Sequence, residues 1–214
     1  CIHHSTENAQ SNKVIVKNLS KNYNSNQLFN DITFSAPEGS YIQIVGASGC
    51  GKSTLLKILF GACRQDEGLV NFHSVKYDCF SEVSSNSLCF VEQTTPLFEG
   101  TLFELICIES KNIDKYKRVL EITCLTELAS HVKDDIINER STNISSGQKQ
   151  RIILARALYE EPEFLFLDES FSNIDFKTKN SIFHNLKVLM PRLIVIYTSH
   201  DTLDQKHADQ IINL

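Results

Sequence analysis

A glycine-rich segment followed by a lysine and two hydroxyl residues is the part of the sequence best suited to chemistry. It follows the apolar run 41–45 and reads Gly46-Ala47-Ser48-Gly49-Cys50-Gly51-Lys52-Ser53-Thr54. Glycines let the backbone curl until successive N–H groups point at one anion, and the following helix adds its positive dipole end. The pattern therefore predicts a phosphate-binding loop, in which Lys52 reaches the β- and γ-phosphates and Ser53 binds Mg²⁺. The alternative is a glycine turn that only begins an ordinary helix.

Two acidic residues come directly after a second apolar run. The run 164–167 is continuous, as in a strand buried on both faces, and it ends in Asp168 and Glu169. Beside a phosphate-binding loop, Asp168 would hold Mg²⁺ or its water. Glu169 would then act as a general base that takes a proton from an attacking water. The alternative is that the pair only starts the next turn.

Polar residues also follow two other apolar runs. Gln93 comes just after the run 88–91. His200 comes at the end of a buried strand expected at 193–199, whose apolar run is 193–197. Ligands of open α/β sheets lie beyond the carboxyl ends of the strands. We therefore expect Gln93, Asp168 and His200 at the same edge of one parallel sheet, where Gln93 can reach the metal or a water.

Two further features are ambiguous from the residues alone. Ser145 and Gln148 fit a capping box at the start of a helix, whereas the N–H groups of Ser146 and Gly147 with the Ser145 hydroxyl would form a second anion site. Tyr23 is either an ordinary tyrosine at a strand end or an aromatic side chain that stacks on adenine.

The remaining pattern predicts one α/β domain from residue 13 to residue 214, preceded by a polar linker or chain end at residues 1–12. Two strands before the phosphate loop, at 13–19 and 28–34, indicate an antiparallel β layer. Residues 101–128 are helical in pattern, which predicts a helical lobe over about residues 95–150. Further helices are expected at 55–62 and 179–189, and a short strand at 69–72.

Composition excludes several classes of function. The 42% of apolar residues suffice for a sizeable core, and the net charge of −5 provides no basic field for nucleic acid. No apolar run approaches the roughly 18 residues of a membrane span. Seven cysteines without C-x-x-C pairs indicate a reducing compartment. Since residue 1 is Cys, we expect the chain to be cut from a longer protein.

Together these motifs resemble the nucleotide-binding domain of ATP-binding-cassette (ABC) transporters over about residues 14–212. The resemblance implies a Mg²⁺-dependent ATPase with a P-loop core, a mostly parallel sheet, an antiparallel β layer and an inserted helical lobe. It implies that Tyr23 stacks on adenine, that Gln93 links Mg²⁺ to a transmembrane partner and that His200 contacts the γ-phosphate. It also implies that Asp175 belongs to the D-loop. The signature Ser145–Gln148 is expected to contact ATP bound to a second copy.

Within this family the sequence resembles exporters, with bacterial peptide, bacteriocin or toxin secretion as one subgroup. The stretch 93–106 is similar to the segment after the exporter Q-loop, and Glu139-Arg140 resembles the exporter X-loop. Two departures are Ser146, where a glycine is usual, and Asp201, which importers often carry. The expected partners are a second cassette, as a homodimer, and transmembrane domains, so that the cassette works at the cytoplasmic face of a membrane. The alternatives are an importer subunit, a regulatory cassette with little turnover, and a soluble cassette that acts on translation or DNA repair.

Overall fold

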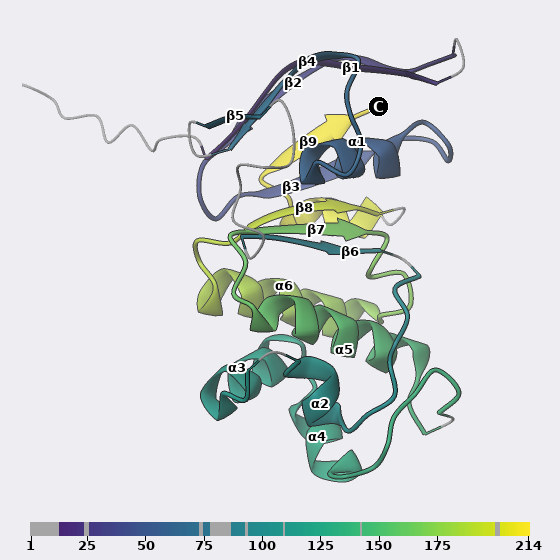
Figure 1. The fold of residues 1–214 in the computed structure, drawn as a ribbon, viewed down its shortest axis with the longest axis vertical. Coiled ribbons are helices and arrows are strands. Elements are labelled where there is room, and N and C mark those ends of the chain that lie inside the picture. The colour runs from purple at the N-terminus through teal and green to yellow at the C-terminus, as the bar shows by residue number, and fades with distance from the viewer. Residues whose placement is uncertain are drawn as a thin grey trace, which may run out of the picture.

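Two β-sheets and the helices between and below them form the layers of the molecule (Figure 1). The computed structural model describes residues 13–23, 26–72, 75–77, 87–92, 94–108, 110–141, 143–199 and 202–214. From one end to the other, Figure 1 shows an antiparallel sheet, α1, a parallel sheet, the pair α5 and α6, and then α2, α3 and α4. This order confirms the predicted combination of a parallel sheet with an antiparallel layer.

The parallel sheet has the strand order β6-β7-β8-β3-β9. Its strands are β3 (Tyr41–Val45), β6 (Leu88–Val91), β7 (Phe164–Asp168), β8 (Ile194–Thr198) and β9 (Gln210–Asn213). The antiparallel sheet has the order β2-β1-β4-β5 and consists of β1 (Val14–Tyr23), β2 (Asn26–Ala36), β4 (Glu67–Phe72) and β5 (Val75–Tyr77). The apolar runs therefore became strands as predicted, while β9, whose middle residue Ile211 is exposed, has no such signal.

Six α-helices cover the parallel sheet or extend below it among the described residues. They are α1 (Lys52–Phe60), α2 (Leu102–Ile106), α3 (Ile113–Ile122), α4 (Thr126–Val132), α5 (Ser146–Tyr159) and α6 (Phe176–Leu189). A 3₁₀ helix, η2 (Thr202–His207), precedes β9. The predicted helical pattern over residues 101–128 is divided into three helices. The Asn112 side chain accepts from the N–H groups of Asp114 and Lys115 and starts α3, and Cys124 at φ 55° separates α3 from α4.

Residues of β7 and β8 alternate between two cores, because successive strand side chains point to opposite faces. Phe164 and Phe166 pack with α1 and the antiparallel sheet, and Phe72 of β4 meets the Phe164 ring edge-on at a centroid distance of 4.7 Å. Leu165 and Leu167 pack with α5 and α6 on the other face. Burial on both faces explains why these strands read as continuous apolar runs.

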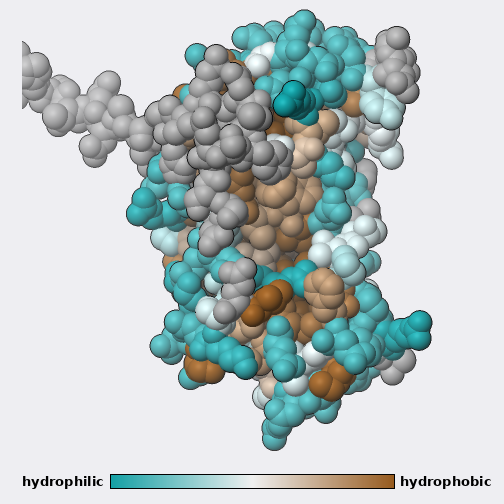
Figure 2. Space-filling model, viewed as in Figure 1, coloured by the Kyte–Doolittle hydropathy of each residue, from teal (hydrophilic) through white to brown (hydrophobic). Residues whose placement is uncertain are grey.

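The surface combines hydrophilic residues with a few apolar areas. Figure 2 shows apolar groups at the centre of one face, level with α1 and the parallel sheet, within a largely hydrophilic surround. Among the residues that the structure describes, no helix combines the length and the apolar character needed to span a bilayer.

Candidate functional site

The glycine-rich loop between β3 and α1 depends on backbone conformations that favour glycine. Gly49 and Gly51 have φ angles of 79° and 105°, in the left-handed region. A Cβ on Gly46 would lie 2.6 Å from Cys50 Sγ and 3.0 Å from the carbonyl oxygen of Leu214. The loop can therefore curl tightly only because these positions lack side chains.

The N-terminus of α1 is open to a ligand. Gly51 is its N-cap residue, so no side chain caps the helix, and no acidic residue lies in the first turn. The first N–H groups of a helix have no acceptor within the helix, and the helix dipole makes this end positive. The start of α1 therefore has the geometry of an anion site, unlike a helix that its own side chains cap.

Lys52 lies inside this loop and is only 6% exposed. Its Nζ donates hydrogen bonds to the carbonyl oxygens of Gly46, at 3.0 Å, and Ala47, at 2.9 Å. The ammonium group of Lys52 therefore lies against the backbone of the glycine-rich loop. An anion with several oxygens would replace these carbonyl partners and gain a charge-assisted hydrogen bond.

A chain of hydrogen bonds joins the loop to the ends of β7 and β8. Ser53 Oγ donates to Asp168 Oδ1 at 3.0 Å, and Thr198 Oγ1 donates to the same oxygen at 2.9 Å. Thr198 Oγ1 also accepts from the backbone N–H of Glu169 at 2.9 Å. Asp168 and Thr198 face each other in the parallel register of β7 and β8. The two acidic residues and the phosphate loop therefore meet at the carboxyl edge of the sheet, as open α/β sheets require of a ligand site.

The oxygen atoms at this junction suit a magnesium ion. Mg²⁺ prefers hard oxygen ligands and is usually held by one or two carboxylates together with phosphate oxygens and water. Ser53 and Asp168 offer a hydroxyl and a carboxylate that already lie within hydrogen-bond distance of each other. This donor set therefore fits Mg²⁺ next to the phosphate loop.

Glu169 stands in an unusual backbone conformation beside a cavity. Its φ is 50°, in the left-handed region that a non-glycine residue adopts at a cost of about 1–3 kcal/mol. A cavity of about 260 Å³ is lined by Glu169 together with Phe171, Ser172, Ile174, Phe176, Lys179, Thr198 and Ser199. The bend after Asp168 thus ends the strand and places Glu169 in the wall of this cavity.

The predicted signature segment forms a capping box at the start of α5. Ser145 Oγ accepts from the N–H of Gln148 at 3.1 Å, and Gln148 Oε1 accepts from the N–H of Ser145 at 2.7 Å. Ser146 is exposed beside this cap. The capping reading is therefore realised in the structure, while the Ser145 hydroxyl proton remains able to donate to an incoming anion.

Gly147 lies against the loop that precedes α6. A Cβ at this position would stand 2.5 Å from the carbonyl oxygen of Asn173, a backbone atom. Gln150 Oε1 accepts from the N–H of Asn173, and Gln150 Nε2 donates to Ser172 Oγ. The start of α5 and the loop 170–175 therefore form one joined surface.

Asp175 is the N-cap residue of α6. Its side chain accepts from the N–H of Thr178 at 3.0 Å, and this hydrogen bond is the main reason that the pKa of Asp175 lies below its usual value. Asp175 therefore starts α6 by capping it. Because the residue is exposed, its carboxylate can also accept hydrogen bonds from groups outside the helix.

Of the remaining predicted site residues, Tyr23 is described by the structure, whereas Gln93 and His200 are not. Tyr23, at the end of β1, is 66% exposed and its ring is available for stacking. Gln93 and His200 lie outside the described residues. The sequence analysis did not predict a role for Thr198. Its hydroxyl side chain at the end of a buried apolar run, two residues before His200, is the signal that would have indicated one.

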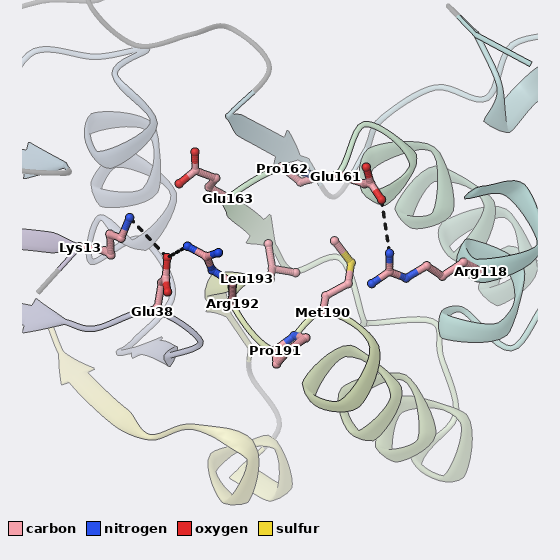
Figure 3. Close-up of a pocket in the computed structure, with 10 residues that line it drawn as sticks. All are labelled: Lys13, Glu38, Arg118, Glu161, Pro162, Glu163, Met190, Pro191, Arg192 and Leu193. Carbon is pink, nitrogen blue, oxygen red and sulfur yellow. Dashed lines mark hydrogen bonds and ion pairs between the residues drawn. The ribbon is translucent and has the colours of Figure 1, made fainter. Parts of the chain in front are cut away.

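A second cavity lies at the opposite end of the parallel strands (Figure 3). It has a volume of about 580 Å³ and includes Pro162 and Glu163, just before β7, and Leu193, just before β8. Among its charged residues, Glu38 pairs with Lys13 and Arg192, and Glu161 pairs with Arg118. Because ligands of such sheets bind at the carboxyl ends, this cavity is not part of the phosphate site.

Several known proteins are similar to this chain in sequence. A family model described as ABC transporter matches residues 29–172. The spermidine/putrescine import ATP-binding protein PotA of Haemophilus influenzae is 32% identical over 207 residues, which are 91% of this chain and 54% of that protein. A putative export ATP-binding/permease protein of Rickettsia felis is 32% identical over 206 residues, which are 92% of this chain and 36% of that protein.

A solved structure shares the fold. The structure of a bacterial Atm1-family ABC exporter with ATP bound matches with a TM-score of 0.84 and 24% identity, over 94% of this chain and 37% of the exporter chain. The chain therefore spans little more than half of PotA and about a third of the two export proteins.

The contact between Gly147 and Asn173 leads to a prediction. Gly147→Ala should lower the free energy of unfolding by about 1–3 kcal/mol, because a backbone carbonyl must move to admit the methyl group. Gly100→Ala is the control, since its Cβ would meet its nearest neighbour at 3.4 Å, and its effect should be about 1 kcal/mol or less. Urea unfolding followed by circular dichroism measures both, and equal stability of Gly147→Ala and the parent would contradict the tight contact.

Proposed function

The chain belongs to the ABC transporter family and is an ATPase cassette of that family, and we propose that two copies hydrolyse ATP to power export through transmembrane domains. The hydrogen-bonded chain Ser53–Asp168–Thr198 carries this proposal. It joins the phosphate loop to the end of β7, which supplies both acidic residues, and to the end of β8, which supplies Thr198. Such a junction suits the hydrolysis of a bound nucleotide, because phosphates, metal and base must meet at one place.

Each residue of the junction has a proposed role. The loop 46–54 and Lys52 hold the β- and γ-phosphates of ATP, with Tyr23 stacked on the adenine. Ser53, Asp168 and Gln93 hold Mg²⁺, which would neutralise charge that develops on the phosphates. Glu169 takes the proton of the attacking water, and His200 binds the γ-phosphate.

A second copy completes each site. The helix α1 packs on one face of the parallel sheet and α5 packs on the other, so the two helix N-termini of one chain serve different nucleotides. A head-to-tail pair about a two-fold axis would bring the phosphate loop of one chain to the Ser145–Gln148 segment of the other, with Asp175 beside it. ATP would hold the two copies together, and hydrolysis would release them.

An exposed apolar pair is the proposed docking point for the transmembrane domains at the cytoplasmic face of the membrane. Phe98 is 62% exposed and Ile136 is 55% exposed. They flank the antiparallel bridge of Gly100 and Ile137, whose backbone hydrogen bonds measure 3.0 and 2.9 Å. This surface follows Gln93 in the chain, so movement at the metal could reach the membrane partner through it.

An importer subunit is the second candidate. It is favoured by the similarity to the PotA import protein and by Asp201, which follows His200. Sequencing the gene upstream of Cys1 distinguishes the two candidates. About six membrane-spanning segments in the same reading frame would support the exporter, and a start codon close to Cys1 would favour the importer.

Lys52 provides the test of nucleotide binding. Lys52→Ala should lower kcat for ATP hydrolysis by about 100-fold or more and weaken ATP binding, because a buried cation is lost from the phosphates. Lys57→Ala is the matched control, since Lys57 lies on the same helix in an exposed ion pair with Glu92 at 3.2 Å. Wild-type turnover in Lys52→Ala would refute the proposed function.

Glu169 provides the test of the shared site. Glu169→Gln should lose about 10²–10⁴-fold in rate, because the general base is gone, yet it should bind MgATP and accumulate as a dimer. Size exclusion with light scattering, with ATP and with ADP, measures the effect. A variant that stays monomeric with saturating ATP at high protein concentration would count against the two-copy site.

Cys50 provides a chemical test of the loop. Its sulfur lies over Gly46, inside the proposed phosphate site, and the thiol is partly exposed. A maleimide should therefore label Cys50 and stop hydrolysis, and MgATP should block the labelling. Mass spectrometry reports the modified residue, with the partly exposed Cys63 at the other end of α1 as the internal control. Equal labelling of Cys50 with and without MgATP would contradict its placement.

A further inference from the structure

A buried ion pair lies next to the proposed hydrolysis site and has no part in the chemistry described so far. Lys179 of α6 is 5% exposed and Asp204 of η2 is 1% exposed. Lys179 Nζ lies 2.9 Å from Asp204 Oδ1 and 3.1 Å from Oδ2. Removing two charges from water is costly, and a packed apolar pair is often at least as stable. Stability alone therefore does not explain this pair.

Asp204 also binds the end of β8. The Ser199 hydroxyl donates to Asp204 Oδ2, and the Tyr197 hydroxyl donates to the backbone carbonyl of Asp204 at 3.0 Å. One buried residue thus joins α6, η2 and the last residues of β8. Without the Asp204 carboxylate, Ser199 would lose the acceptor that holds the end of this strand on this face.

The opposite face of the same strand end holds the acidic residues. Tyr197 and Thr198 are consecutive residues of β8, so their side chains leave the strand on opposite faces. Thr198 bonds Asp168 Oδ1 and the N–H of Glu169. Tyr197 bonds Asp204 from the other face, and so does Ser199, which follows the strand. All four of Lys179, Ser199, Thr198 and Glu169 line the cavity of about 260 Å³. The end of β8 is therefore fixed from both sides, and its position determines that of Thr198.

A second contact fastens η2 to α6. His207 Nε2 and Asn180 Oδ1 lie 2.7 Å apart, and the His207 ring stacks on Phe183 at a centroid distance of 4.4 Å. The helix α6 begins after the cap at Asp175. The ion pair consequently connects the first turns of α6, at the proposed dimer surface, with the strand end that holds the acidic residues.

We propose that Lys179 and Asp204 are positioning residues for ATP hydrolysis. They hold the end of β8, and through it Thr198, where Asp168 and Glu169 can act on Mg²⁺ and water. A displacement of about 1 Å at a reacting group can cost roughly 100-fold in rate. This inference rests on the proposed function.

The test removes both charges together. Lys179→Met/Asp204→Leu leaves no unpaired buried charge, so we expect it to fold, as thermal unfolding will report. Its kcat for ATP should fall about 10-fold or more, with KM changed by less than about threefold, because the phosphate loop is untouched. Ser199→Ala removes only the hydroxyl that bonds Asp204, and it should lower kcat in the same direction.

A second ion pair of α6 provides the matched control. Lys187 Nζ lies 3.5 Å from Asp209 Oδ1, and both side chains are about half exposed. Lys187→Met/Asp209→Asn keeps the oxygen that accepts from the N–H of Tyr41 and should retain kcat within about twofold.

Three results would overturn the inference. They are wild-type kcat in a folded Lys179→Met/Asp204→Leu variant, an equal loss of kcat in the control pair, and wild-type kcat in Ser199→Ala if the double variant does not fold. A wild-type chain without ATPase activity would instead refute the proposed function, and the inference would fall with it.

Discussion

The contact of Ser53 with Asp168 is the interaction on which the rest of the site depends. It is a single hydrogen bond of 3.0 Å, yet it joins the phosphate loop to a strand that lies two positions away in the sheet. Thr198, from the strand between them, bonds the same carboxylate oxygen. Two neighbouring strands and the helix that follows a third therefore contribute to one cluster of oxygen atoms. The parallel direction of the strands is what places their carboxyl ends at the same edge.

Burial of the parallel sheet on both faces makes this arrangement rigid. Phe166 and Leu167 belong to different cores, so β7 cannot slide or rotate without disturbing packing on one side. Polar groups tolerated at the end of such a strand need partners, and Asp168, Thr198 and Ser199 have them. A metal or phosphate would thus enter a site whose protein ligands are already ordered, which lowers the entropy that binding must overcome.

The two predicted anion sites differ in the way their helices begin. At α1 the N-cap is Gly51, which has no side chain to compete for the helix N–H groups. At α5 the capping box of Ser145 and Gln148 already uses two N–H groups. The first therefore suits tight binding of phosphates within one chain, and the second suits a contact that forms when another copy supplies the nucleotide.

The sequence by itself determined the local chemistry: the glycine pattern 46–51, the apolar runs that became β3, β6 and β7, and the acidic pair after one of them. These features are read from near neighbours, because turns, caps and buried strands each follow from a few adjacent residues. Only the tertiary structure decided that Thr198 bridges Asp168 and Glu169, that β9 joins the sheet, and that Lys179 pairs with Asp204. Such contacts join residues that lie 25 or more positions apart in the chain, and they depend on strand order and helix placement, which no local pattern encodes.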